Sequence, residues 1–179
     1  VNSTDESKEY SKVAVESIMR WWKEYIFDNT DESAQHIMNA ANYAGRAICI
    51  TQTTAPHAFS YKITSLYGLP HGHAVAVCLP EIWTFMLQNP DLCIDKRGEG
   101  YLIGVFHQIA QSMNVTTPQD AVLYFRKMMK EMSLANPISN NKEQEVDILS
   151  HSVNPVRLKN NPIVINERTA HALYSQIVE

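Results

Sequence analysis

Hydrophobic and polar positions follow helical periods along nearly the whole chain. From Ser3 to about Phe27, apolar and aromatic residues recur every three to five positions, and a second such segment follows the polar break at 28–32 and reaches Ile48. This spacing gives each segment one apolar stripe, which is typical of helices that pack against neighbours. Ser3 stands three residues before Glu6, the spacing of a capping box. The pattern therefore predicts two long amphipathic helices at the start of the chain.

Glycine and proline divide the next part of the chain into two helices. We expect one helix over 55–67, ended by Gly68 in the left-handed conformation, and another over about 70–86 with Pro70 in its first turn. The second is apolar on nearly every side, which is typical of a helix at the centre of a bundle. Pro80 should kink this helix or end it early.

Further helical segments complete the pattern. They cover about 99–113, 117–134 and 143–150, and a last helix that Asn166 caps and that reaches Ile177. The segment 154–164 is rich in proline and asparagine, so we expect it to be extended. Because no sustained strand alternation is present, the sequence predicts an all-α, multi-helix bundle.

Length and charge narrow the class of protein. The 179 residues suffice for one domain with a hydrophobic core, but not for two well-sized domains. With 15 basic and 19 acidic residues the net charge is −4, which argues against a nucleic-acid partner. No apolar run approaches the length of a membrane span, and the start of the chain lacks the features of a signal peptide. Three cysteines without CxxC spacing favour reduced thiols, so we expect a cytoplasmic protein with no membrane partner.

Three histidines gather around one expected turn. His57 and His71 are 14 residues apart in the sequence, which would separate them by about 21 Å on a continuous helix. Because Gly68 and Pro70 reverse the chain between them, both side chains can point into one cleft and share a metal ion. His73 lies two residues further on. A single histidine is more often an ordinary polar residue, but this arrangement indicates a candidate metal site.

Short motifs accompany the histidine pair in a consistent order. Upstream stands Asn-Tyr-Ala-Gly-Arg-Ala (42–47), the second histidine lies in Pro-His-Gly (70–72), and Lys-Asn-Asn-Pro (159–162) precedes the final helix. Together they resemble the helical C-terminal half of the iron-containing alcohol dehydrogenases, over essentially the whole chain. Within that family, segments 54–62 and 68–76 look most like the phosphonoacetaldehyde reductase branch.

This resemblance implies a divalent metal, Fe²⁺ or Zn²⁺, and NAD(P)H bound mainly by an N-terminal α/β domain. His57 and His71 match two of the family's four metal ligands. The other two, an Asp and a residue four positions later that is usually His, belong to a helix before Ser3 and are absent from this sequence. A glycine-rich phosphate-binding turn is also absent from this sequence. We therefore expect 1–179 to be the metal-binding C-terminal domain of a longer enzyme, inactive alone and with an incomplete metal site. The first residue, Val1 rather than Met, fits a fragment or a processed product.

Three residues near the histidine pair are candidates for substrate binding. Tyr61 follows His57 by four residues and should share its helix face, forming a wall of the site. Lys62 could pair with a phosphonate dianion, or be an ordinary solvated lysine. His73 could relay a proton, contact substrate or only face solvent.

A second Asp-x3-His spacing occurs at Asp147 and His151. It would put both side chains on one helix face. In the family, however, the ligating pair precedes the two later histidines in the chain. We expect a polar surface pair here.

Two other functions remain open at this stage. The chain could be a non-catalytic helical interaction module that binds a partner through its apolar faces, or a small metal-binding bundle complete in itself. An apolar face left uncovered without a nucleotide domain could instead form a homodimer. Only the enzyme hypothesis requires an Asp-x3-His pair and a nucleotide domain upstream of Val1, with a small aldehyde or alcohol as substrate.

Overall fold

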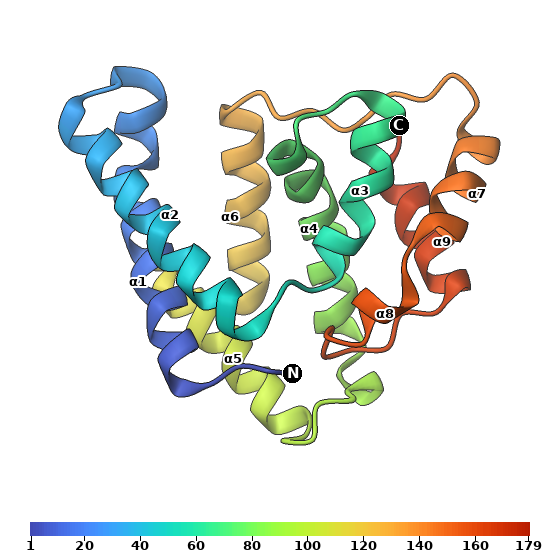
Figure 1. Cartoon of the computed structure of the whole chain (residues 1–179), viewed down its shortest axis with the longest axis horizontal. Helices are drawn as coiled ribbons and strands as arrows, with labels where there is room; N and C mark the ends of the chain where they lie inside the picture. Colours follow the sequence, from blue (N-terminus) through green and yellow to red (C-terminus); the bar gives the residue numbers. More distant parts are fainter. The chain divides into compact units, whose positions relative to one another are not determined.

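Helices and their connections make up the whole structure. The computed structural model describes residues 1–179 and contains nine α-helices, one π-helical turn and one 3-10 turn (Figure 1). The prediction of an all-α fold is confirmed. The chain divides into two units: residues 1–52 with 103–121 form the first unit, and residues 53–102 with 122–179 form the second.

A helical hairpin dominates the first unit. It consists of α1 (Asp5–Lys23) and α2 (Asp31–Thr51), and most of α5 (Glu99–Ser112) belongs to the same unit. Near the tip of the hairpin, the Trp21 and His36 rings stack with their centroids 4.2 Å apart. The expected apolar stripes are covered only in part, because Ala14 and Ala40 are buried whereas Met38 and Ile48 are exposed.

The ends of α1 differ from the prediction. The N-cap is Thr4 rather than Ser3, because the Thr4 hydroxyl accepts a hydrogen bond from the Ser7 backbone N–H at 3.1 Å and Ser7 Oγ accepts one from the Thr4 N–H at 2.9 Å. At the other end, a π-helical turn η1 (Glu24–Asp28) follows α1, and Asn29 ends it with φ of 50°. Serine thus completes the capping box in place of glutamate.

The second unit packs its helices around α4. Its elements are α3 (Ala55–Tyr67), α4 (His71–Gln88), η2 (Pro90–Leu92), most of α6 (Pro118–Glu131), α7 (Lys142–Ser152), α8 (Pro155–Leu158) and α9 (Glu167–Ile177). Helix α4 contacts α3 and α9, and α3 also contacts α7 and α8. The buried residues of α4, among them Val77, Ile82 and Trp83, lie on several sides of the helix, as expected for the most apolar helix.

Two aromatic side chains join α3 to α9. The Phe59 and Tyr174 rings stack with centroids 4.6 Å apart, and the Tyr174 hydroxyl donates a hydrogen bond to the Phe59 carbonyl oxygen at 2.9 Å. Both side chains are fully buried, and this burial raises the pKa of Tyr174. A buried hydroxyl needs such a partner, so the contact fixes α3 against α9.

Gly68 ends α3 as predicted, whereas Pro70 precedes the first turn of α4 and α4 does not end early at Pro80. Gly68 ends α3 with φ of 68°, and Pro70 is the residue just before the first turn of α4. Helix α4 continues through the buried Pro80, where the Thr84 hydroxyl donates to the Pro80 carbonyl oxygen at 2.7 Å. The expected early end at Pro80 is therefore wrong. A proline removes only one backbone donor, and packing on the buried sides of α4 holds the helix together.

The segment expected to be extended contains a short helix. In α8, the Asn154 side chain caps the first turn by accepting from the Val156 N–H at 2.9 Å, and Pro155 takes the first helical position. Asn followed by Pro is a helix-start signal that the overall proline content conceals. The chain then forms an isolated antiparallel bridge between Cys93 and Ile163.

Asn166 caps α9 as the sequence predicts. Its side-chain oxygen accepts a hydrogen bond from the Thr169 backbone N–H at 2.9 Å. Asn166→Ala should lower the free energy of unfolding by about 1 kcal/mol, because that N–H loses its partner. Denaturant titration should show a lower midpoint with an unchanged slope, while Asn166→Ser should stay near the parent protein. Equal midpoints for the parent and the alanine variant would show that the cap contributes nothing.

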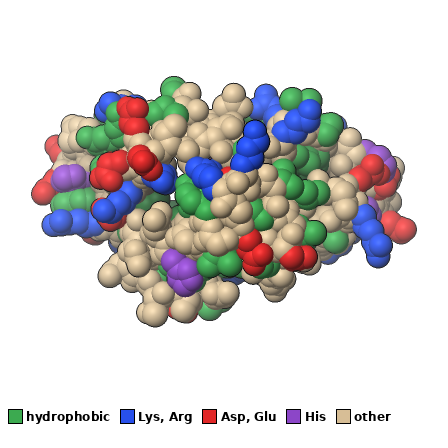
Figure 2. All heavy atoms as spheres, turned by 90° about the horizontal axis from the view of Figure 1, so that it is seen from below, with side chains coloured by type: hydrophobic (Ala, Val, Ile, Leu, Met, Phe, Trp, Pro, Cys, Tyr) green, Lys and Arg blue, Asp and Glu red, His purple; other side chains and the backbone are tan.

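The surface mixes charges of both signs. On the face drawn in Figure 2, acidic and basic side chains are interspersed among hydrophobic ones and form no large patch of one sign. None of the helices has the length and apolar composition that crossing a bilayer requires. All three cysteines are free thiols, and Cys78 is buried.

Candidate metal site

The reversal of the chain at Gly68 brings two histidine rings together in the second unit. His57 lies in the first turn of α3, and His71 is the first residue of α4. Their ring centroids are 5.6 Å apart and the ring planes meet at 60°. His57 and His71, 14 residues apart in the sequence, thus lie close together at the N-terminal ends of α3 and α4.

The separation of the two ring centroids matches that of two ligands of a single metal ion. Metal–imidazole bonds are about 2.0–2.1 Å long, so the ring centroids of two histidines on one ion lie roughly 5 to 6 Å apart. Burial lowers the pKa of His57, and His71 and Arg157 lower it further. A lowered pKa favours the neutral imidazole, which is the form that binds metal. However, the chain holds no group of three or more His, Cys, Asp or Glu side chains placed for a metal ion, so the pair is at most part of a site.

A tyrosine and an arginine extend the histidine pair. Tyr61 stacks on His71 with ring centroids 5.6 Å apart and planes at 25°. Arg157, from α8, donates a hydrogen bond from Nη1 to the Tyr61 hydroxyl at 2.9 Å, and its Cζ lies 4.8 Å from the Tyr61 ring centroid. We call His57, His71, Tyr61 and Arg157 the histidine–arginine cluster.

Arg157 is the member of this cluster that sequence reasoning missed. It lies in a segment for which the sequence predicted no helix, far along the chain from the histidines. No local motif includes it, so only the tertiary contact between α3 and α8 reveals it.

The structure does not bring the other two candidate residues into the cluster. Lys62 follows His57 by five residues, which turns it about 140° around the axis of α3, whereas Tyr61 is turned by only about 40°. The Lys62 side chain is half-buried. His73 has its Nε2 atom 2.8 Å from the Ala135 carbonyl oxygen, in the connection between α6 and α7. Substrate contacts by Lys62 and His73 therefore stay predictions.

Asp147 and His151 form an exposed pair on α7. His151 Nδ1 lies 3.4 Å from an Asp147 carboxylate oxygen, and Nε2 lies 3.0 Å from Glu167 Oε1. A hydrogen bond to the Asp147 backbone carbonyl, together with the two carboxylates, raises the pKa of His151. These contacts favour the imidazolium, which cannot bind a metal. The pair lies on the surface, as expected from the sequence.

The pKa values of His57 and His151 should lie on opposite sides of the value of an unperturbed histidine. In the metal-free 179-residue chain, we expect the ring resonances of His57 to titrate at lower pH, and those of His151 at higher pH, than a histidine in an unfolded peptide. NMR titration with His57→Gln and His151→Gln variants for assignment measures both midpoints. A His57 midpoint at or above the unfolded value would contradict the burial of this ring.

The same pKa shifts predict how the stability of the chain depends on pH. Folding lowers the pKa of His57, so its contribution is present above the unfolded-state pKa and is lost as pH falls through the lowered value. His151 is the opposite case: its pKa is raised, so its contribution is present below the unfolded-state pKa and is lost as pH rises through the raised value. Denaturant unfolding at a series of pH values should accordingly show less acid destabilisation for His57→Gln than for the parent chain.

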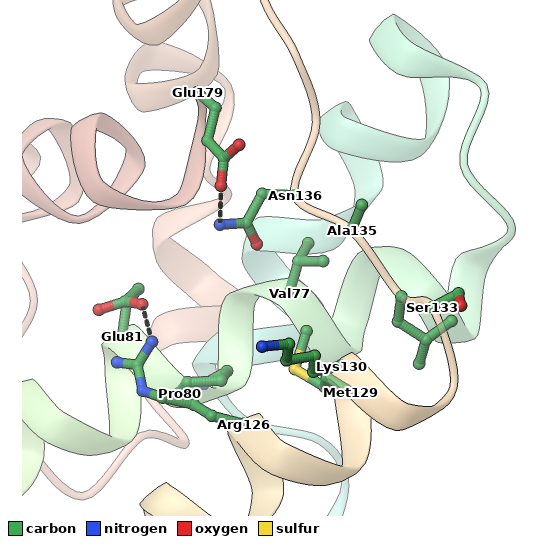
Figure 3. Close-up of a pocket in the computed structure, with 11 residues that line it drawn as sticks. Val77, Pro80, Glu81, Arg126, Met129, Lys130, Ser133, Ala135, Asn136 and Glu179 are labelled. Atoms are coloured by element: carbon green, nitrogen blue, oxygen red, sulfur yellow. Dashed lines mark hydrogen bonds and ion pairs between the residues drawn. The ribbon is translucent and has the colours of Figure 1, made fainter.

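A cavity elsewhere in the second unit is separate from the histidine–arginine cluster. It lies between α4, α6 and the segment that follows α6 (Figure 3). Its charged groups are largely paired: Arg126 Nη1 lies 2.6 Å from Glu81 Oε1, and the Asn136 side-chain amide donates to Glu179 Oε1 at 3.1 Å. None of its lining residues belongs to the cluster.

Comparison with known proteins identifies the family of this chain. The chain belongs to the Fe-containing alcohol dehydrogenase family, whose C-terminal family model matches residues 1–178. Among curated relatives, the phosphonoacetaldehyde reductase of Streptomyces viridochromogenes is 32% identical over 124 residues, which are 68% of this chain and 31% of that protein. Aldehyde-alcohol dehydrogenase 2 of Entamoeba histolytica is 25% identical over 146 residues, 79% of this chain and 16% of that protein. The matched segments of this chain thus cover a third or less of the length of these relatives.

Solved structures confirm the fold. The iron-containing alcohol dehydrogenase of Thermococcus thioreducens superimposes with a TM-score of 0.83 at 18% identity, covering 98% of this chain and 45% of that one. The sulfoacetaldehyde reductase of Bifidobacterium kashiwanohense, solved with NAD⁺, gives a TM-score of 0.82 at 16% identity, covering 97% and 44%. The expected family and its helical C-terminal fold are both confirmed.

Proposed function

We propose that residues 1–179 are the metal-binding C-terminal domain of an NAD(P)H-linked reductase that converts phosphonoacetaldehyde to 2-hydroxyethylphosphonate. The observation that carries this proposal is the pair of imidazoles, His57 and His71, held at a separation that suits one metal ion. The family membership supports the reaction class, and the 32% identity to a phosphonoacetaldehyde reductase supports the substrate.

The reaction adds a hydride to the aldehyde carbon and a proton to its oxygen, while the nicotinamide is oxidised. The metal, Fe²⁺ or Zn²⁺, would supply Lewis-acid polarisation of the aldehyde oxygen. His57 and His71 would each give one ring nitrogen to it, and the remaining ligands and the nucleotide-binding domain would come from residues outside this chain. Tyr61 would form a wall beside His71, and Lys62 and His73 are further candidates for contact with the substrate.

The test is a direct comparison of two aldehydes with the full-length enzyme that contains this chain. Oxidation of NADH and NADPH should be followed with phosphonoacetaldehyde and with an uncharged aldehyde of similar size. We expect kcat/KM to be at least about tenfold higher for the phosphonate, the effect of one charge-assisted hydrogen bond. The 179-residue chain alone should show no turnover. Equal kcat/KM values for the two aldehydes would overturn the substrate assignment, and turnover by the isolated chain would overturn the assignment as a domain.

A further inference from the structure

One arginine stands beside the histidine pair with its charge uncompensated. Arg157 makes no ion pair, unlike Arg97 and Arg126. Arg20, Arg46 and Arg168 make none either, but of these four arginines only Arg157 contacts Tyr61 beside the histidines. A guanidinium has five N–H donors, and Arg157 uses one of them on the Tyr61 hydroxyl. Most of its hydrogen-bonding capacity is therefore left for a ligand.

The position of Arg157 is set by the fold. Asn154 caps the short helix α8, and just after that helix the Asn160 side chain donates to the Thr53 carbonyl oxygen at 2.9 Å, next to the start of α3. The Tyr61 ring, which contacts both His71 and Arg157, spaces the guanidinium from the histidines. A ligand that reaches a metal on the histidines can thus meet a cation at its other end.

We propose that Arg157 binds the anionic group of the substrate and so selects phosphonate-bearing aldehydes over neutral ones. This inference rests on the proposed function and deepens it. A planar guanidinium matches the oxygens of a phosphonate with two parallel N–H···O bonds, which a neutral aldehyde cannot accept.

Arg157 suits this role better than Lys62. Lys62 is turned away from the face of α3 that carries His57 and Tyr61, whereas Arg157 touches Tyr61 directly. An ammonium group also lacks the fork geometry for bidentate binding.

The test uses Arg157 variants of the full-length enzyme. In Arg157→Met, kcat/KM for phosphonoacetaldehyde should fall roughly 10- to 150-fold, while kcat/KM for an uncharged aldehyde of similar size should change by less than about twofold. Arg157→Lys should recover part of the loss. Arg168→Met, which removes an exposed arginine of α9 outside the cluster, is the matched control and should leave both values unchanged. Equal losses on both aldehydes in Arg157→Met would overturn the role of Arg157 without affecting the proposed function.

A binding measurement keeps the inference testable if the proposed function fails. Methylphosphonate should inhibit reduction of the uncharged aldehyde competitively, with an inhibition constant about tenfold or more higher in Arg157→Met than in the parent enzyme. An unchanged constant would overturn the inference. If the parent enzyme does not prefer phosphonoacetaldehyde but this constant rises, the substrate assignment fails and the anion-binding role of Arg157 stands. Should Arg157→Met not fold, as judged by circular dichroism, Arg157→Gln takes its place in both measurements.

Discussion

Replacing His71 with alanine in the full-length enzyme should lower kcat/KM by at least about 100-fold. Changes in residues that only support a metal ligand already cost about 10- to 100-fold in affinity or activity, so loss of a ligand should cost no less. The metal content of the purified enzyme, measured by elemental analysis, should fall in parallel, because one of the two imidazoles, whose ring centroids are 5.6 Å apart, is gone. His57→Ala should behave in the same way.

His151→Ala is the matched control for this experiment. His151 has the same residue type and lies in an Asp-x3-His spacing, but its ring nitrogens already contact Asp147 and Glu167 on the surface. Metal content and kcat/KM should therefore stay at the parental level. If His151→Ala loses metal while His71→Ala keeps it, the surface pair is the true ligand pair and the assignment of His57 and His71 is wrong.

Local signals in the sequence predict most of the helix boundaries. Gly68 ends a helix because only the left-handed conformation continues the chain there, and Asn166 starts one because its side chain caps a free N–H. Both signals depend on neighbouring residues alone. They therefore hold whatever the rest of the chain does.

Local sequence signals fail in this chain where tertiary packing decides the structure. Pro80 should interrupt a helix by local rules, yet α4 passes through it because its buried sides are held by the surrounding helices. The π-helical turn Glu24–Asp28 cannot be told from the first helix in the sequence, because Tyr25, Ile26 and Phe27 continue its apolar spacing although all three are exposed in the structure. Short helix α8 is hidden because the proline and asparagine content of its segment is also typical of loops.

The residues of the candidate site also fall into two groups, those that helical spacing predicts and one that only tertiary packing reveals. His57, His71 and Tyr61 lie on the two helices that meet at Gly68, so spacing and helical geometry suffice to bring them together. Arg157 reaches them only through the packing of α8 on α3, for which a sequence without homologues gives no signal. The residue that we propose to select the substrate is thus the one that required the structure.

Phe59 shows how the core supports this site. It lies two residues after His57, so it points to the opposite side of α3, about 200° around the helix axis. There its ring stacks on Tyr174 of α9, and its carbonyl oxygen accepts the Tyr174 hydroxyl. The contact between Phe59 and Tyr174 therefore holds α3, which also contains His57 and Tyr61, against α9.

Phe59→Ala should accordingly lower the free energy of unfolding of the chain by about 3–5 kcal/mol, through lost burial and the cavity left beside Tyr174. For a chain of this length, that loss corresponds to a fall in Tm of roughly 6–20 °C, measurable by circular dichroism. Phe27→Ala is the matched control, because 58% of that phenylalanine is exposed, and it should cost less than about 1 kcal/mol. Tyr174→Phe, which removes only the buried hydroxyl, should cost about 1 kcal/mol. Equal destabilisation by Phe59→Ala and Phe27→Ala would show that the stacked pair does not anchor α3, and the support that we assign to the histidine site would have to come from elsewhere in the second unit.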